Sequence, residues 1–332
     1  MDVLDSLLGA FQQAFSPVTA AFALAAIGLN IHFGYTGLLN FGQAGFVAIG
    51  AYAFAIGVVV LGLPWWAALL LAVAGAIGFA LLLGAPTLRL RGDYLAIVTI
   101  AAAEIVRYTV NSSLFDDVTG GAQGITNNPS QDTDYSTDLD ALNPLPAGRI
   151  TIGDWVFTSS ALWWAIVTWT VVAIVSVIVW RLMRSPWGLT LRGVREDQEA
   201  MRSLGKNVNA IKMQALIIGG VIGAIAGVLL IMPASVAPAD YNTRMTFNLF
   251  TIVLLGGAAT ILGPIVGSLL FWVLLQVTDR VITLLAGTGA LDWFADAAQL
   301  RFSLVGLALI LLVLFRPQGL LGDRKEMSFA RS

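Results

Sequence analysis

Long apolar stretches separated by short polar turns dominate the hydrophobic pattern of the chain. They lie at residues 16–34, 41–62, 64–84, 93–111, 160–180, 213–232, 246–257, 264–285 and 301–316. A helix needs roughly 20 mostly apolar residues to cross the hydrocarbon core of a bilayer, and most of these stretches approach that length. The pattern therefore predicts an all-α polytopic membrane protein with about 8–10 transmembrane helices, folded as a single domain over residues 1–332.

Two regions interrupt this pattern. The 246–257 stretch is short and ends at Gly256-Gly257, and Pro264 begins the next one, so we interpret the two as halves of a broken or re-entrant element. Four glycines between residues 37 and 50 surround the polar Asn40 and Gln43. We therefore expect an irregular start to the second span.

The composition agrees with a membrane protein and removes several kinds of chemistry. Of the 332 residues 58% are hydrophobic and only 11% are charged, whereas soluble domains average about 25% charged residues. The absence of cysteine excludes disulfides and thiolate metal sites, and a single histidine, His32, argues against a histidine metal site or a Ser-His-Asp arrangement. We predict no catalytic residues, no metal and no cofactor bound by this chain. The segment from Met1 to Asp5 lacks the basic region of a signal peptide, so the first span is expected to be retained.

The basic residues indicate the orientation. Residues 181–212 contain seven of them, which are Arg181, Arg184, Arg192, Arg195, Arg202, Lys206 and Lys212. Lys and Arg are enriched in short cytoplasmic loops, so we place 181–212 in the cytoplasm. Alternation of the spans then places Arg89, Arg91 and the tail (317–332, preceded by Arg316) on the same side.

The same alternation places residues 112–158 outside the membrane. This segment contains seven aspartates and one basic residue, Arg149, and it is rich in Gly, Asn and Pro. It reads as a long extracytoplasmic loop. A docking or lid surface for an external partner and a solvated connector are both compatible with it.

Small residues predict close helix packing in the 213–232 stretch. Gly219, Gly223 and Gly227 recur every four residues, which allows two helix backbones to approach each other closely. Gly256 and Gly257 are further candidates for packing of this kind.

A few polar residues fall at membrane depth. Glu104 and Arg107 are spaced so that they can pair on one face of a helix, and Glu104 lies roughly 16 Å into a helix that begins near residue 93. Such a pair either fixes the rotation of its helix or lines a translocation path or gate. Asn40 and Gln43 are candidates for the same path if their backbone is unwound inside the membrane, and the alternative is a turn at the cytoplasmic side. His32 is interpreted as an interfacial hydrogen-bonding residue, with a pH-sensitive gate as the alternative.

The polar segment 188–205 predicts a short helix at the cytoplasmic face. Residues between Glu196 and Leu204 favour a helix, and Gly205 suits its end. A short amphipathic helix could insert into a groove of a soluble partner; charge alone also fits a plain connector.

Within this segment Glu199-Ala200-Met201-x-x-x-Gly205 resembles the coupling motif Glu-Ala-Ala-x-x-x-Gly of ABC importer permeases. Further segments resemble, in the expected order, the branched-chain amino acid permease family of LivM type. They are Gly34-Tyr-Thr-Gly-Leu-Leu-Asn-Phe-Gly-Gln-Ala-Gly-Phe46 with Gly50-Ala-Tyr52, Leu90-Arg-Gly-Asp-Tyr-Leu-Ala-Ile-Val-Thr99 with Ala103-Glu104-Ile-Val-Arg107, Thr119-Gly-Gly-Ala-Gln-Gly124, Leu255-Gly-Gly257 with Gly263-Pro264, and Arg316-Pro-Gln-Gly319. The resemblance covers roughly residues 20–322. Met201 replaces the second Ala of the coupling motif, and Asn40-Phe-Gly-Gln43 replaces a Ser-Leu-Gly-His, which leaves branched-chain amino acids, urea, amides and other small solutes open as substrates.

The resemblance implies a permease of a bacterial or archaeal cytoplasmic membrane. Its implied partners are ABC ATPase subunits, a second, LivH-like permease and an extracytoplasmic solute-binding protein. No nucleic-acid partner is implied. The residues implied to contact the ATPase are Arg195, Glu196, Asp197, Glu199, Ala200, Met201 and Gly205. The chain contains no Gly-x-x-x-x-Gly-Lys-Ser/Thr phosphate loop. ATP is therefore expected on the partner subunits, and this chain is expected to be a transport subunit and not an enzyme.

Two other classes of function compete with this one. An ATP-independent channel or secondary transporter would also suit the Glu104/Arg107 pair and the broken spans. An intramembrane enzyme is disfavoured, because the chain has no His-Glu-x-x-His motif, no Gly-x-Ser-x-Gly motif and no cluster of metal-ligand residues.

Overall fold

The computed structural model describes residues 12–88, 92–127, 137–146, 148–152, 155–287 and 318–322, together with the single residues Gly9, Tyr135, Gly306, Leu307 and Ile310. Helices account for nearly all of the regular structure in these residues. One short two-stranded hairpin is the only sheet found in them.

The large helices follow the predicted apolar stretches closely. They are α2 (Pro17–Asn30) continued by the π-helix η1 (Ile31–Tyr35), α3 (Gln43–Val59), α4 (Trp65–Thr87), α5 (Gly92–Val110), α8 (Ser159–Arg184), α11 (Val208–Ile231), α12 (Thr243–Gly256) and α13 (Gly263–Gly287). Four helices in the described residues are long and apolar enough to cross a bilayer, and α5 adds a fifth if its bent continuation to Thr119 is counted with it. Three shorter apolar helices, α3, α12 and the Gly263–Asp279 part of α13, add to these. The prediction of an all-α polytopic membrane protein is confirmed; apart from three single residues, the 301–316 stretch lies outside the described part of the chain.

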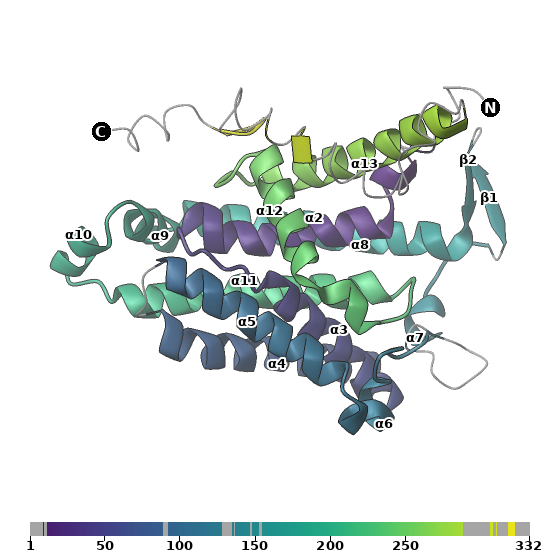
Figure 1. Cartoon of the computed structure of the whole chain (residues 1–332), viewed down its shortest axis with the longest axis horizontal. Helices are drawn as coiled ribbons and strands as arrows, with labels where there is room; N and C mark the ends of the chain where they lie inside the picture. Colours follow the sequence, from purple (N-terminus) through teal and green to yellow (C-terminus); the bar gives the residue numbers. More distant parts are fainter. Residues whose placement is uncertain are drawn as a thin grey trace.

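Short elements gather at the two ends of the helix bundle. α9 (Pro186–Glu196) and α10 (Gln198–Ser203) lie together at one end, on the left of Figure 1. The opposite end carries η2 (Ser113–Phe115), α6 (Asp116–Thr119), α7 (Thr137–Asp140) and the antiparallel strands β1 (Arg149–Ile152) and β2 (Trp155–Thr158), in which Arg149 pairs with Thr158. We refer to these as the α9–α10 end and the hairpin end.

Polar side chains define where several helices begin. Ser16 caps α2 by accepting the N–H of Thr19 at 3.2 Å, directly before Pro17 at the first helical position. Asn207 caps α11 through the N–H of Ala210 at 3.1 Å. Such caps satisfy N–H groups that the first turn of a helix leaves without a partner.

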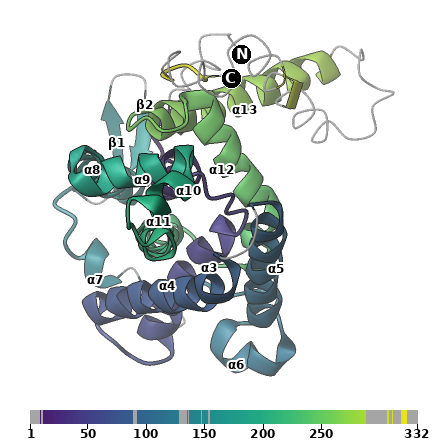
Figure 2. The same ribbon diagram turned by 90° about the vertical axis from the view of Figure 1, so that its left-hand side faces the viewer.

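α11 forms the centre of the bundle. It packs against α2, α3 and α4, and in the view from the α9–α10 end it lies between α8 and α4 (Figure 2). α12 crosses obliquely between α13 and α5 in both ribbon views, next to the short helix η4 (Pro238–Tyr241) that precedes it.

Glycines bring α11 into backbone contact with its neighbours. A Cβ added to Gly227 would collide with the carbonyl oxygen of Val47 on α3. A Cβ on Gly219 would lie 2.5 Å from the carbonyl oxygen of Gly28 on α2, and a Cβ on Gly28 would collide with the carbonyl oxygen of Gly219 in return. These contacts exclude any larger residue unless the helices move apart.

The predicted loop 112–158 contains more structure than the sequence indicated. Besides its short helices and hairpin, it is fastened to the segment between α11 and α12. Ile125 and Val236 form an isolated antiparallel bridge, and the hydroxyl of Tyr135 donates to the carbonyl oxygen of Ala234 at 2.5 Å. These long-range contacts have no local sequence signal, which is why the pattern of Gly, Asn and Pro indicated only turns.

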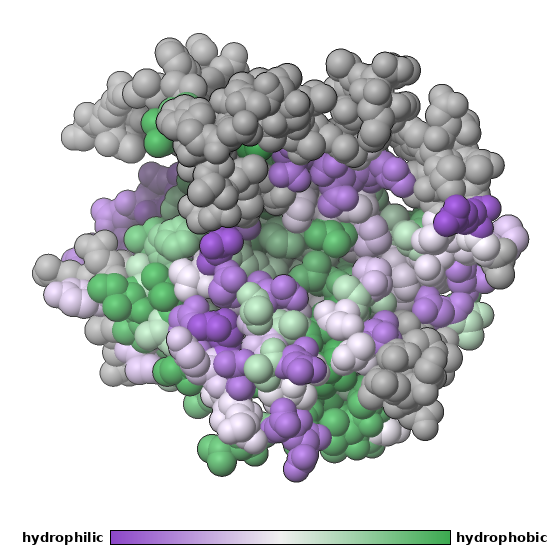
Figure 3. All heavy atoms as spheres, turned by 45° about the vertical axis from the view of Figure 1, so that its right-hand side comes forward, coloured by the Kyte–Doolittle hydropathy of each residue, from purple (hydrophilic) through white to green (hydrophobic). Residues whose placement is uncertain are grey.

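Large apolar side chains remain exposed on the outer faces of the helices. Leu82 of α4 is 78% exposed, Ile105 of α5 is 66% exposed and Val177 of α8 is 52% exposed. Figure 3, in which the hairpin end comes forward, shows hydrophobic residues on both sides of a mixed, largely hydrophilic middle. Exposed apolar surface of this extent is expected where lipid or another membrane chain covers a helix.

We predict that Gly227→Ala destabilises the protein, because the added methyl group meets backbone and forces α3 away from α11. The expected cost is about 1–3 kcal/mol, measured as a lower melting temperature of the detergent-solubilised protein by tryptophan fluorescence. Gly78→Ala on α4 is the matched control, since a Cβ there meets no atom within 4 Å. Equal melting temperatures for the two variants would contradict the packing described here.

Candidate functional site

The chain unwinds between α2 and α3 and turns back into the bundle. After η1, residues 36–42 form no helix, and the N–H of Leu38 donates to the carbonyl oxygen of His32 at 2.8 Å. α3 then begins at Gln43, whose Nε2 donates to the carbonyl oxygens of Ala25 at 3.3 Å and Gly219 at 3.4 Å. Both residues lie near the middle of their helices, so the linking segment (residues 36–42) ends deep inside the membrane-spanning bundle. The expected irregular start of the second span is present.

A buried polar network holds this unwound backbone. The side-chain amide of Asn40 donates to His32 Nδ1 at 3.0 Å and to Gln43 Oε1 at 3.4 Å. Since Nδ1 accepts, the neutral imidazole carries its proton on Nε2, which lies 3.2 Å from the carbonyl oxygen of Leu216 on α11. Asn40 Oδ1 accepts the N–H of Gly42 at 2.9 Å. The network joins η1, the linking segment, α3 and α11.

The residues of this network lie in the interior of the chain. His32, Asn40 and Gln43 are at most 2% exposed, and a Cβ added to Gly223 would lie 2.6 Å from Gln43 Nε2. His32 therefore hydrogen-bonds in the interior of the bundle, because η1 directs it towards α11. A place at the membrane interface and a role as a pH-sensitive gate stay predictions. A part for Asn40 and Gln43 in a translocation path stays a prediction.

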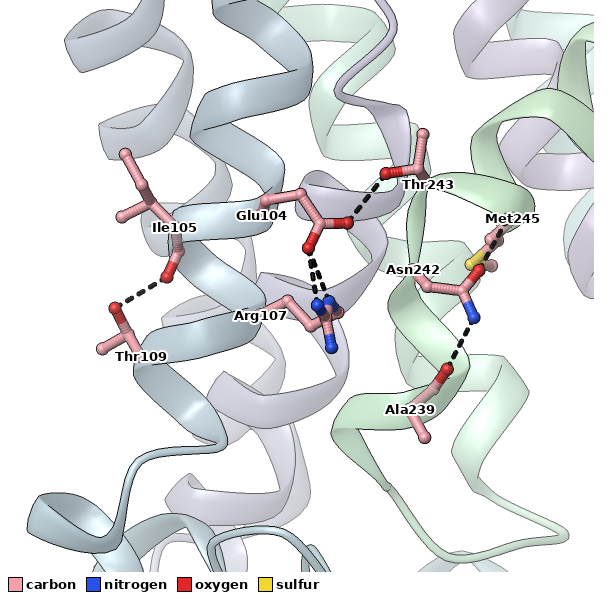
Figure 4. A network of polar contacts seen from close by, with 8 residues as sticks. All are labelled: Glu104, Ile105, Arg107, Thr109, Ala239, Asn242, Thr243 and Met245. Carbon is pink, nitrogen blue, oxygen red and sulfur yellow. Dashed lines mark hydrogen bonds and ion pairs between the residues drawn. The ribbon is translucent and has the colours of Figure 1, made fainter.

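Glu104 connects α5 to the beginning of α12. Its Oε2 accepts from Arg107 Nε and Nη2, both at 2.7 Å, and its Oε1 accepts the hydroxyl proton of Thr243 at 2.7 Å (Figure 4). The pairing at this spacing agrees with the expectation, whereas the bond to Thr243 had no sequence signal. The side chains of Glu104 and Arg107 are 25% and 21% exposed. Their carboxylate and guanidinium thus lie on a partly accessible face of the bundle.

Two threonines that the sequence did not single out support the unwound region. The hydroxyl oxygen of Thr99 on α5 accepts the N–H of Phe41 at 3.0 Å. The hydroxyl oxygen of Thr246 on α12 accepts the N–H of Ala44 at 3.1 Å, in the first turn of α3. The linking segment is therefore held from α5, and the first turn of α3 that follows it is held from α12 and α11.

Residues 181–212 are mostly helical. α8 continues to Arg184, and α11 already begins at Val208, so the non-helical part is shorter than the predicted loop. Lys212 is buried in α11, where its Nζ donates to Gln198 Oε1 of α10 at 2.7 Å. This bond ties α10 to the first turn of α11.

The expected short helix is present as α10. Asp197 caps it by accepting the N–H groups of Glu199 at 2.9 Å and Ala200 at 3.0 Å. Gly205 follows with φ of +74°, the left-handed conformation that commonly ends a helix. Glu199 and Arg202 form an exposed ion pair at 3.6 Å.

α9 connects α10 to the rest of the bundle. It buries Leu191 and Val194, and the side chain of Met201 on α10 lies against Gly193. Arg195 Nη1 donates to the carbonyl oxygen of Gly34 in η1 at 2.7 Å. α9 is thus bonded directly to the helix that precedes the linking segment.

The end of α12 is fastened in a comparable way. Gly257 has φ of +116°, and the chain turns there towards α13. Asn30 spans this turn, accepting the N–H of Ala259 at 2.9 Å and donating to the carbonyl oxygen of Thr260 at 2.8 Å. The N–H of Leu321 donates to the carbonyl oxygen of Gly256 at 3.0 Å. In the described part of the tail, residues 318–322 therefore pack on the end of α12.

No group of three or more His, Asp or Glu side chains is placed to hold a metal ion in the part of the chain that the structure describes.

Comparison with known proteins gives consistent results. Residues 14–314 match the family described as branched-chain amino acid transport system / permease component. The high-affinity branched-chain amino acid transport system permease protein LivM of Salmonella typhimurium is 33% identical over 92% of this chain and 68% of the relative. LivM of Escherichia coli is 31% identical with the same coverage. LivH of Salmonella typhimurium is 27% identical over 96% of this chain and 97% of the relative.

We predict that Asn40→Ala lowers the melting temperature, because it leaves His32 Nδ1 and the Gly42 N–H without partners in a buried site. Each such group costs about 1–3 kcal/mol. Asn248→Ala is the control, since Asn248 is half-buried on α12 and its side chain forms no hydrogen bond within the described residues. A melting temperature for Asn40→Ala equal to that of the control would show that the network does not stabilise the bundle.

Proposed function

Since the chain belongs to the branched-chain amino acid transport permease family and is a permease subunit of an ABC importer, we propose that it moves its substrate inward by ATP-driven alternating access. The substrate is a branched-chain or related amino acid, delivered by an extracytoplasmic binding protein. This chain supplies one half of the pathway and a LivH-like permease supplies the other. ATP binds to separate ATPase subunits, and the assembly lies in a bacterial or archaeal cytoplasmic membrane.

The observation that carries this proposal is the arrangement of α9 and α10. α10 protrudes from the basic end of the bundle, which the positive-inside rule assigns to the cytoplasm, and the side chain of Glu199 is 89% exposed. The Arg195 bond to η1 and the Lys212 bond to α10 link this exposed helix to two of the central helices. α10 is therefore suited to receive a motion from a soluble ATPase and to pass it inward.

The residues that would contact the ATPase are the exposed ones of this helix pair. Glu196, Asp197, Glu199 and Ala200 are all exposed, and they lie on or next to α10. Arg195 donates to η1 and Met201 packs on α9, so we assign them to the transmission of the motion and not to the ATPase contact itself.

The pathway is proposed to run along the face formed by α5, α12 and the linking segment. Glu104, Arg107 and Thr243 offer both charge signs and a hydroxyl on this partly accessible face, and charged groups at membrane depth commonly face an aqueous route or another chain. Asn40 and Gln43 support the linking segment from the interior of the bundle, and their direct part in the path stays a prediction. The acidic hairpin end is proposed as the docking surface for the binding protein.

Purification of the tagged chain in mild detergent, with mass spectrometry of the chains that accompany it, tests the assembly. Two ATPase chains and a second permease are expected. Reconstitution of this complex with its binding protein should then give uptake of radiolabelled leucine that requires ATP and is inhibited by vanadate. Vanadate-insensitive uptake by this chain alone would instead support a channel or secondary transporter.

A substitution at Gly205 tests the coupling role of α10. We expect Gly205→Val to reduce substrate-stimulated ATP hydrolysis several-fold without affecting membrane insertion, because a β-branched residue is strained at positive φ and would reorient α10. Gly205→Asn is the matched control, since asparagine tolerates this conformation and the site is open to a side chain. Equal ATP turnover in both variants and the wild type would exclude this coupling role.

A further inference from the structure

Four phenylalanine side chains gather where the linking segment meets α12. The rings of Phe41 and Phe250 stack with centroids 4.4 Å apart, and the rings of Phe41 and Phe247 lie 5.6 Å apart. Phe33 of η1 makes an edge-to-face contact with Phe250 at 5.3 Å. We call these four residues the aromatic cluster. Contacts of this kind favour close ring packing, so the cluster fills the space between η1, the linking segment and α12.

The aromatic cluster reaches the accessible face of the bundle. Phe247 is 50% exposed although it lies within a membrane helix. It follows Thr243 by four residues, so the two side chains share one face of α12 on successive turns. Two features therefore follow one another along this face of α12. The contact between Thr243 and Glu104 comes first, and the aromatic cluster lies beyond it, nearer the α9–α10 end.

Phe41 occupies the part of the cluster that is best suited to move. Its backbone belongs to the non-helical linking segment, where a shift does not require a helix to unwind. At the other end of this segment Gly37 has φ of +70°, and a Cβ placed on it would be 3.3 Å from Arg195 Cγ. Together with the Arg195 bond to Gly34, this contact allows a displacement of α9 to act directly on the segment that carries Phe41.

We infer that Phe41 and Phe247 form the barrier that closes the substrate path towards the α9–α10 end, and that the path opens when the linking segment withdraws Phe41 from Phe247. This inference rests on the proposed function. A hydrophobic constriction excludes water and ions by dewetting, and a zwitterionic amino acid passes such a constriction only after the rings separate. The polar residues Glu104, Arg107 and Thr243 lie on the other side of this barrier.

The first test measures leak through the reconstituted complex. Phe41→Ala is expected to raise ATP-independent efflux of radiolabelled leucine from proteoliposomes several-fold, because the alanine leaves a gap beside Phe247. Phe41→Leu keeps an apolar plug of similar bulk and should leak much less. Phe79→Ala is the control, since Phe79 of α4 packs edge-to-face on Phe46 at 4.8 Å, away from the aromatic cluster. A leak of Phe41→Ala no greater than that of the control would overturn the inference.

A second test does not depend on how well the alanine variant folds. The chain contains no cysteine, so the pair Phe41→Cys and Phe247→Cys can be bridged by a short bifunctional thiol reagent. Bridging should abolish the ATP-dependent uptake that the double variant retains before treatment, and cleavage of the bridge by reductant should restore uptake to that level. Each single variant treated with the same reagent should keep the uptake that it shows without the reagent. Undiminished uptake in the bridged protein, or no bridged product, would contradict the barrier.

The proposed function and the barrier are tested by different outcomes. If the wild-type complex shows no ATP-dependent uptake, the proposed function is wrong. If the wild type transports but neither the leak nor the bridge has the expected effect, the function stands and the barrier is wrong.

Discussion

The rest of the structure depends on how this chain provides hydrogen-bond partners for non-helical backbone inside a membrane. A peptide group without a hydrogen-bond partner in hydrocarbon costs several kcal/mol, so non-helical segments are tolerated there only when protein or water supplies the partners. In the linking segment two polar side chains supply them, and a third holds one of these two in place. Asn40 accepts the Gly42 N–H, Thr99 accepts the Phe41 N–H, and His32 fixes the amide of Asn40. α3 can begin at mid-depth because these bonds replace those of a missing helical turn.

η1 is the junction at which the separate parts of the molecule meet. Asn30 just before it holds the turn after α12, His32 within it holds the linking segment, and the carbonyl oxygen of Gly34 receives Arg195 from α9. π-helical turns within α-helices are frequent at functional sites. Here the wider turn coincides with three long-range bonds that come from different elements. α9 is therefore connected to both irregular regions of the bundle through a few residues that are adjacent in the chain.

The sequence predicted most of the fold and part of the candidate site, and the difference has a physical origin. Apolar length and periodicity act locally, so the spans, the Glu104–Arg107 pair and the α10 helix with Gly205 at its end were predictable. The partners of Glu104 and Gln43 across the bundle were not, because Thr243 is 139 positions away from Glu104 in the sequence and Gly219 is 176 positions away from Gln43. Threonine also carries no special signal in an apolar helix. The aromatic cluster could not be predicted from the sequence either. Phenylalanines are common in membrane spans, and only the fold shows which of them are in contact. The anchoring of Tyr135 on the carbonyl oxygen of Ala234 also rests on a distant contact.

The contact between Gly28 and Gly219 restricts how this sequence can diverge. In most cores a larger side chain at one position is accommodated by a smaller one opposite, so the two positions drift together. Here each α-carbon faces the other residue's carbonyl oxygen, which is present whatever amino acid occupies that site. No compensating substitution exists across this contact, and relief could come only from a change in the distance between the two helices. Because α11 also receives His32 and Gln43 beside the same point, such a change would disturb the buried network as well. We therefore expect Gly28, Gly219 and the buried network to be conserved together or to change together among related sequences.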